Sequence, residues 1–323
     1  MLRLPLELSF SRISVVARAI RESFTEVVKA IEDFTDPHFY PPKNEEVEKV
    51  LRYFFFMVAI DHRTSRLKPF EMRIGGESYH GADLLYHLGV LRYREDPDYF
   101  NPDRMAAISL EEVTKWLRTQ SGESIWDPDV RAELLRDAGI KLIKYFRGSV
   151  SELVRVSRGY IRHPTTYGLG NLLKVFKAYS DPVEKKQFLF IKFALRRGLI
   201  KVVDTHNIEV PVDNHLTRVA LRLKLVKLDD HLMRKVSSRS EFTYEEDIEL
   251  RMAVRRAYNY VSRISCIRPD YLDDFLWAFG RKYCTRENPA CERSNFCPLS
   301  SVCASLGNAS KIVEHNYVNT YYY

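Results

Sequence analysis

The sequence has no long hydrophobic run. Its longest uninterrupted apolar stretch, Tyr53–Ile60, has eight residues, whereas a helix that crosses a bilayer needs about 20. Glu7, Ser9 and Arg12 interrupt the N-terminal stretch where a signal peptide has its apolar core. The sequence therefore predicts neither a membrane span nor an export signal, and we expect a cytoplasmic protein with no membrane partner.

Internal repeats, low-complexity tracts and long linkers are also missing from the 323 residues. Hydrophobic residues make up 45% of the chain and charged residues 29%. This composition is ordinary for a folded protein and excludes intrinsic disorder. The length suits one large domain or two lobes that share a core.

A strong net charge is absent as well, because 50 Lys and Arg stand against 43 Asp and Glu, a net of +7. One segment, from Lys141 to Val203, holds all of this excess, with fourteen bases against three acids. Several clustered bases are what a phosphate-binding surface needs. The alternative is a set of solvated helix faces whose charges point in different directions.

Helical periodicity dominates the rest of the chain. Apolar residues recur at steps of three and four from Ile13 to Phe34, which predicts a helix that ends at Asp36-Pro37. Asp127-Pro128 and Asp181-Pro182 open two more helices, with Gly139 as a candidate break in the first and Gly198 as the C-cap of the second. Further helices are expected at Ser109–Leu117, with Ser109 as its cap, and at Asn214–Leu225, Tyr244–Ser262 and Tyr271–Arg281.

A single hairpin is expected at Phe70–Tyr79, with Gly75-Gly76 at its turn. The sequence therefore predicts an all-α fold with one small β-hairpin. The loops at 92–107 and 226–243 are the expected junctions between two lobes. One lobe would comprise 1–105 together with 226–323, and the other 106–225.

Four of the five cysteines lie within twenty residues, as Cys284-x6-Cys291-x5-Cys297-x5-Cys303. Polar and turn-forming residues separate them, so these thiols are not core side chains. A disulfide pair is disfavoured in a reducing compartment, and structural zinc usually has C-x2–4-C spacings, which are narrower. The spacing favours a [4Fe-4S] cluster over zinc. Cys266 lies outside the group, and we expect a small buried hydrophobe there.

The segment Val212-Asp213-Asn214-His215-Leu216-Thr217-Arg218-Val219, followed by the four cysteines, resembles the endonuclease III branch of the helix-hairpin-helix DNA glycosylases. The resemblance implies a two-lobed helical fold, Asp213 as the catalytic residue, a [4Fe-4S] cluster on the four cysteines, and DNA as the partner in base excision repair. It makes His215 and Arg218 candidate substrate contacts. The gap from Cys291 to Cys297 is three residues wider than in that family, an insertion at or near Ser294-Asn295-Phe296.

The family's Leu-Pro-Gly-x-Gly hairpin corresponds here to Asp181–Gln187, which has lost both glycines. Without glycine the backbone amides cannot approach a phosphate as closely. We expect Lys185 and Lys186 to compensate by charge. Gln187 stands where bifunctional members have a Schiff-base lysine, which implies a monofunctional enzyme. Lys192 is a candidate second active-site residue.

The front half also resembles the queuosine-salvage N-glycosidases, which hydrolyse a free modified nucleotide. The similar residues run from the Phe70–Tyr79 hairpin through Tyr79-His80-Gly81 and Tyr179-Ser180-Asp181 to Asp213. Members of this family have no iron–sulfur loop. The chain thus resembles one family in its front half and another in its back half.

Both resemblances imply hydrolysis of an N-glycosidic bond. A fixed carboxylate stabilises the positive charge that develops on the sugar and can orient or deprotonate the attacking water. The alternative for Asp213 is a helix cap without catalytic function. The leading hypothesis is a monomeric, monofunctional DNA glycosylase. The alternatives are a queuosine 5′-phosphate N-glycosidase and a catalytically silent iron–sulfur DNA-binding protein.

Overall fold

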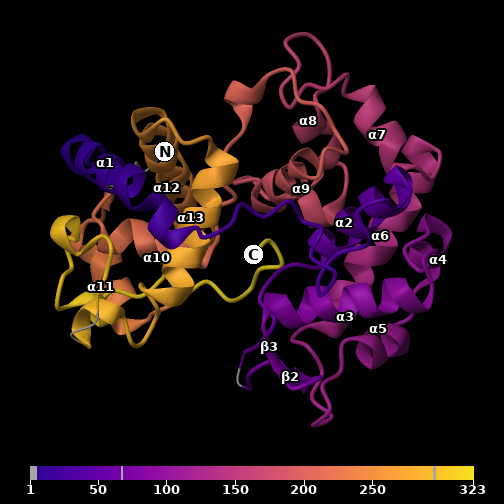
Figure 1. Cartoon of the computed structure of the whole chain (residues 1–323), viewed down its shortest axis with the longest axis horizontal. Coiled ribbons are helices and arrows are strands. Elements are labelled where there is room, and N and C mark those ends of the chain that lie inside the picture. Colours follow the sequence, from indigo (N-terminus) through magenta and orange to yellow (C-terminus); the bar gives the residue numbers. More distant parts are fainter. Residues whose placement is uncertain (1–5, 67, 294–295) are drawn as a thin grey trace. The chain divides into compact units, whose positions relative to one another are not determined.

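The computed structural model describes residues 6–66, 68–293 and 296–323, and its chain divides into two compact units (Figure 1). Unit 1 comprises Met1–Ile31 and Ile208–Thr320, and unit 2 comprises Glu32–Asn207 and Tyr321–Tyr323. The chain thus begins in unit 1, builds unit 2, returns to unit 1 and ends with three residues that belong to unit 2.

Unit 1 is a helical unit in which α1 packs against α12 and α13, and α10 packs against the same two helices. A short antiparallel pair, β1 with β4, joins its beginning to the residues after α10. Its elements are β1 (Glu7–Leu8), α1 (Phe10–Val27), α10 (Asn214–Arg222), β4 (Val226–Lys227), α11 (Asp230–Ser238), α12 (Tyr244–Ser265), α13 (Pro269–Lys282) and the 3-10 turns η3 (Ala290–Glu292), η4 (Ser300–Val302) and η5 (Ala309–Lys311).

Unit 2 is built around α2, whose buried side chains include three consecutive phenylalanines, Phe54–Phe56. Helices α6, α7 and α9 pack on it. The elements of the unit are α2 (Val47–Ala59), β2 (Glu71–Ile74), β3 (Glu77–His80), α3 (Ala82–Glu95), α4 (Pro102–Ala107), α5 (Leu110–Trp116), α6 (Pro128–Phe146), α7 (Val150–Val156), α8 (Leu169–Leu173), η1 (Lys177–Tyr179), α9 (Lys185–Arg196) and η2 (Thr205–Asn207).

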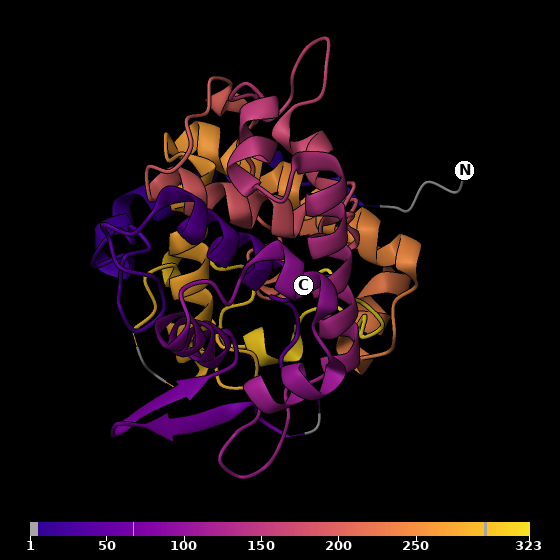
Figure 2. The ribbon, with the colours of Figure 1, turned by 90° about the vertical axis from the view of Figure 1, so that its right-hand side faces the viewer.

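The predicted mostly helical fold with one small hairpin is confirmed. Strands β2 and β3 pair antiparallel with Met72 opposite Tyr79, and Figure 2 shows them side by side. Gly75 and Gly76 both have positive φ, which a two-residue hairpin turn of this type requires. No helix in the described ranges is long and apolar enough to cross a membrane.

Two local predictions on helices need correction. Helix α1 ends at Val27, with Val28 already extended, because the chain passes into unit 2, where Phe34 packs 4.3 Å from the ring of Phe193. Gly139 does not break α6. A Cβ there would lie 2.5 Å from the amide nitrogen of Ala106, so glycine allows α4 to cross α6 closely.

The bounds of the two units differ from the predicted lobes. Residues 32–105 lie in unit 2 with the basic segment, and Asp213 lies in unit 1 with the cysteines. The reason is packing, because the apolar surface of α2 is buried against α9 and α6, whereas α10 is buried against α12 and α13. The loop from 92 to 107 lies within unit 2 and is not a junction.

Candidate active site

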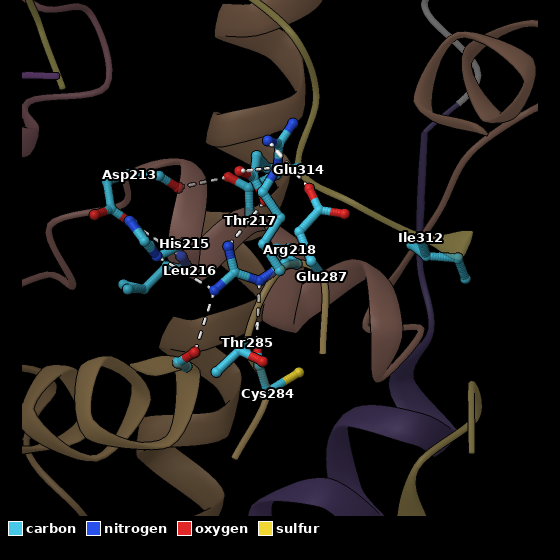
Figure 3. Close-up of polar contacts among 12 residues, drawn as sticks. Asp213, His215, Leu216, Thr217, Arg218, Cys284, Thr285, Glu287, Ile312 and Glu314 are labelled. Atoms are coloured by element: carbon cyan, nitrogen blue, oxygen red, sulfur yellow. Dashed lines mark hydrogen bonds and ion pairs between the residues drawn. The ribbon is translucent and has the colours of Figure 1, made fainter. Parts of the chain in front are cut away.

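Asp213 is the N-cap of α10, directly after the buried residues Pro211 and Val212. Its Oδ1 accepts a hydrogen bond of 2.9 Å from the Leu216 amide (Figure 3). Within the described ranges its Oδ2 has no hydrogen-bond partner. The Tyr258 hydroxyl donates to the Leu216 carbonyl at 2.8 Å and anchors the first turn of the helix. One oxygen of the carboxylate is therefore fixed by the backbone of α10, and the catalytic role of Asp213 stays a prediction.

Arg218, a predicted substrate contact, is buried in unit 1. Its guanidinium pairs with Glu314 at 2.9 Å and donates to the carbonyls of Cys284 and Gly280 at 3.1 and 3.2 Å (Figure 3). These bonds join α10 to the end of α13 and the start of the cysteine loop. His215, an exposed residue, places its Nδ1 3.2 Å from a nitrogen of the same guanidinium. Arg218 is thus a structural anchor here, whereas substrate contact by His215 stays a prediction.

The cysteine loop is fastened to α10 by Arg222, which is fully buried. Its guanidinium donates to the carbonyls of Thr285, Arg286 and Ile312 at 2.7 to 2.8 Å. It also donates to the Cys284 sulfur at 3.2 Å. This contact links the first cysteine of the loop directly to α10.

The four predicted ligand cysteines lie close enough to influence one another. Burial, and then the thiols of Cys284, Cys291 and Cys303, raise the pKa of Cys297 to about 11. No group of three His, Cys, Asp or Glu in the described ranges is arranged to hold a single metal ion. A [4Fe-4S] cluster takes four thiolate ligands, and its presence on these four cysteines stays a prediction. Ser294 and Asn295 of the predicted insertion lie outside the described residues.

Cys266 is not a buried hydrophobe, so that prediction is wrong. The residue is exposed and ends α12 in the left-handed conformation, with φ of 59°. Its place at a helix terminus, rather than its apolar character, determines its exposure.

The turn before α9 is closed by Asp181, which is fully buried. Its two carboxylate oxygens accept hydrogen bonds of 3.0 Å from the amides of Val183 and Lys185. Glu184 follows with a positive φ, and α9 begins at Lys185. Gly198 has a φ of +76° after the last turn of α9, as the sequence predicts. The amides that a phosphate-binding hairpin would present are already used within the protein.

The predicted site residues on α9 are all buried. The Lys186 amine donates to the Ala59 carbonyl at 2.6 Å, and the Gln187 amide nitrogen donates to the Tyr179 carbonyl at 2.7 Å. The Lys185 amine donates to the Asp61 carbonyl at 3.0 Å. Lys192 places its ammonium 5.8 Å from the centre of the Phe34 ring. Lys185 and Lys186 therefore do not belong to an exposed phosphate-binding surface. Substrate contact by Lys185, Lys186 and Gln187, and a catalytic role for Lys192, stay predictions.

The basic segment as a whole is not one continuous surface. Arg197 donates to the carbonyls of Pro41 and Pro42, and Arg196 donates to that of Glu32. At least six of its bases are ion-paired, namely Lys141 with Asp137, Arg155 with Glu152, Arg162 and Lys174 with Glu184, Lys177 with Glu133, and Lys185 with Asp61. The contacts support the alternative, in which these charges point in different directions.

A polar cluster that the sequence analysis missed lies at the end of α2, in the turn Ala59–Arg63. Five consecutive carbonyls of this turn accept hydrogen bonds from three buried cations. Arg131 donates to the carbonyls of Ile60, His62 and Arg63, Lys186 to that of Ala59, and Lys185 to that of Asp61. The helix end is thereby fixed by side chains from α6 and α9.

His62 is buried beside these cations, with its Nδ1 3.4 Å from the Lys186 amine. Burial, and then the charges of Arg131 and Lys186, hold the pKa of His62 well below its usual value. Its Nε2 is buried without a hydrogen-bond partner among the described residues. The signal in the sequence was the Asp-His pair directly after the apolar run Tyr53–Ile60.

No family model matches this sequence. The sequence is 22% identical over 205 residues to a queuosine 5′-phosphate N-glycosylase/hydrolase of Dictyostelium discoideum, and the match covers 57% of this chain. The chain spans 61% of the length of that relative, less than two thirds. A solved structure of 8-oxoguanine DNA glycosylase from Pyrobaculum aerophilum, complexed with 8-oxoguanosine, gives a TM-score of 0.42 at 15% identity, covering 96% of this chain and 99% of that one.

Proposed function

We propose that this protein hydrolyses the N-glycosidic bond of a modified nucleotide of the queuosine 5′-phosphate class. The alignment with the Dictyostelium relative supports this activity. The closed turn at Asp181 favours a free nucleotide over DNA as the substrate. Because Val183 and Lys185 donate their amides to that carboxylate, the turn presents no amide pair to a DNA phosphate.

Asp213 is the proposed catalytic residue. As the bond between sugar and base breaks, positive charge develops on the sugar, and the carboxylate stabilises it. Oδ2 takes a proton from the water that adds to the anomeric carbon, and the departing base takes up a proton from solvent. Oδ1 stays bonded to the Leu216 amide, so the carboxylate keeps its orientation throughout.

Water, and not a lysine, is the nucleophile in this proposal. The amines of Lys185 and Lys186 are bound to main-chain carbonyls inside unit 2, so neither stands free to attack a sugar. Borohydride should therefore trap no covalent adduct between enzyme and substrate. A trapped adduct that disappears in Lys185→Met, Lys186→Met or Lys192→Met would instead identify a glycosylase with a lyase step.

We also propose that Cys284, Cys291, Cys297 and Cys303 hold a [4Fe-4S] cluster with a structural role in unit 1. The neighbouring thiols and the N–H bond from Arg222 to the Cys284 sulfur support this ligand set. Anaerobic metal analysis should find about four irons per chain. Cys297→Ser should lose most of this iron, whereas the control Cys266→Ser should keep it. Stoichiometric zinc without visible absorbance would contradict the cluster.

A DNA glycosylase of base excision repair is the second candidate, favoured by the likeness of the Val212–Val219 segment and the cysteine loop to endonuclease III. Release of free base from queuosine 5′-phosphate, compared with release from duplexes that carry damaged bases, separates the two. We expect release from the nucleotide alone. Release only from duplex DNA would support the second candidate, and DNA binding without any release would support a catalytically silent iron–sulfur protein.

A further inference from the structure

Helix α13 carries an exposed tryptophan with an arginine stacked on it. Trp277 keeps 42% of its surface exposed, whereas Phe275 and Phe279 of the same helix are buried. The guanidinium of Arg281 lies over the Trp277 ring, 4.3 Å from its centre. Stacking of this kind fixes a planar guanidinium through its face, while its N–H donors lie along its edge. The pair therefore presents an oriented cation at the surface of unit 1.

This cation lies near the proposed catalytic residue, within the same unit. Helices α10 and α13 pack against each other (Figure 1). Nη2 of Arg218 donates to the carbonyl of Gly280, the residue before Arg281, at 3.2 Å, and the same nitrogen lies 3.2 Å from Nδ1 of His215. The charges of Asp213 and Arg281 both act on His215. The stacked arginine and the carboxylate are thus neighbours of one exposed histidine.

A fixed cation beside the proposed catalytic carboxylate suits an anionic part of the substrate. In a nucleoside 5′-phosphate the phosphate is attached to the same sugar as the bond that breaks. The group that binds this phosphate must therefore lie near the residue that acts on the bond. A guanidinium matches the oxygens of a phosphate with two parallel N–H donors, and such charge-assisted pairs are stronger than neutral hydrogen bonds.

We propose that Arg281 is a specificity-determining residue that binds the 5′-phosphate of the substrate, and that Trp277 is the positioning residue that orients its guanidinium. The inference rests on the proposed function and names the substrate class, a nucleoside 5′-monophosphate and not a nucleoside. The phosphate adds a charge-assisted contact that the nucleoside lacks. The enzyme then distinguishes the two compounds at the sugar side of the substrate, whatever the base.

The test compares base release from queuosine 5′-phosphate and from queuosine, which differ only in the phosphate. For the native protein kcat/KM should be about 100-fold higher for the nucleotide. Arg281→Met should lower this ratio about 10- to 100-fold, because the charged partner of the phosphate is lost. Arg281→Lys keeps the charge without the planar fork and should retain part of the ratio. Trp277→Leu should lower the ratio by less than Arg281→Met, because the guanidinium stays but is no longer oriented.

The matched control is Lys282→Met. It removes the next cation of the chain, which is also exposed and also lies over an aromatic ring, that of Tyr283, at 5.1 Å. This variant should keep the native ratio. A native ratio near 1, or a ratio in Arg281→Met equal to the native one, would overturn the inference.

Calorimetric binding of ribose 5-phosphate and of ribose to the full chain separates this inference from the proposed function, because it needs no turnover. The native protein should bind ribose 5-phosphate at least about 10-fold more tightly than ribose, and Arg281→Met should lose this difference. That result without cleavage of queuosine 5′-phosphate would support the phosphate site and contradict only the proposed function. Cleavage without any preference for the phosphorylated compound would contradict the phosphate site alone.

Discussion

Asp213 in unit 1 and Asp61 in unit 2 share one feature and differ in how they are held. Within the described residues, each carboxylate has one oxygen in contact with the protein and one without a partner. Asp213 begins a helix and is held by a backbone amide. Asp61 follows the end of a helix and is held by a lysine and a tyrosine.

The helix termini explain this difference. A helix N-terminus offers unpaired amides and partial positive charge, so Asp213 needs no neighbouring cation. A helix C-terminus offers unpaired carbonyls and partial negative charge, so a carboxylate there needs cations to offset it. Unit 2 supplies them from α6 and α9, and the same cations bind the carbonyls of the turn. Local structure therefore holds the carboxylate of Asp213 in position, whereas tertiary contacts hold that of Asp61.

Removing a cation should therefore damage unit 2 most. Arg131→Met keeps a long unbranched side chain but removes the donor to the carbonyls of His62 and Arg63, while the Ile60 carbonyl keeps only its bond from the His62 amide. We expect it to lower the free energy of unfolding by about 3–5 kcal/mol, as measured by urea titration. The exposed lysine of the same helix serves as the control, and Lys144→Met should change stability by less than about 0.5 kcal/mol. Similar losses in both variants would contradict the role given to Arg131.

Asp213→Asn tests the acid in unit 1. Asparagine keeps the oxygen that caps α10, so folding should persist, whereas base release should fall by about 10²- to 10³-fold, since the charge that faces the sugar is lost. The matched control is Asp229→Asn, which changes the same kind of cap on α11, where Asp229 accepts from the Leu232 amide at 2.8 Å. Equal rates of base release in the two variants would indicate that Asp213 is a helix cap without a catalytic role.

Acidification should weaken unit 2 through Glu184, at the start of α9. Burial raises the pKa of Glu184, but the hydrogen bond from Lys174 and the charge of Arg162 outweigh it and keep the pKa below its usual value. Such a group adds stability above the pKa of the unfolded chain, and this stability is lost as pH falls through the folded pKa. Glu184→Gln should cost about 1–3 kcal/mol at pH 7 and progressively less below about pH 4.5. A difference from the native protein that stays constant from pH 7 to pH 3.5 would argue against this ion pair.

The smallest effect is expected from exposed cations of the basic segment. Lys144→Glu and Lys201→Glu change side chains that lie at the surface of unit 2, and a single nucleotide has one phosphate to contact. Release from queuosine 5′-phosphate should change by less than about threefold, since exposed charges are screened by salt. If DNA is the substrate instead, each lost phosphate contact should flatten the slope of log affinity against log salt by about 0.9.

Several elements were predictable because their signals are local. The hairpin at Gly75-Gly76 and the helix that begins at Pro128 follow from turn and cap residues a few positions apart. The end of α1 was not predictable. Apolar residues continue at helical spacing to Phe34, although the chain leaves unit 1 and enters unit 2 before that residue. Periodicity records which residues are buried but not which core buries them.

In the candidate site, too, local features were predictable from the sequence and tertiary contacts were not. By itself the sequence determined Asp213 as a helix cap, the grouping of four cysteines and the loss of glycines in the turn at Asp181–Gln187, because each depends on neighbours within a few residues. Only the tertiary structure decided that the predicted phosphate-binding lysines are buried and that Arg218 anchors the cysteine loop. It also decided the setting of Asp61, whose cations come from positions about 70 and 125 residues later in the chain. A sequence does not show where a charged side chain points. Its burial and its hydrogen-bond partners are determined only when helices distant in the sequence pack together.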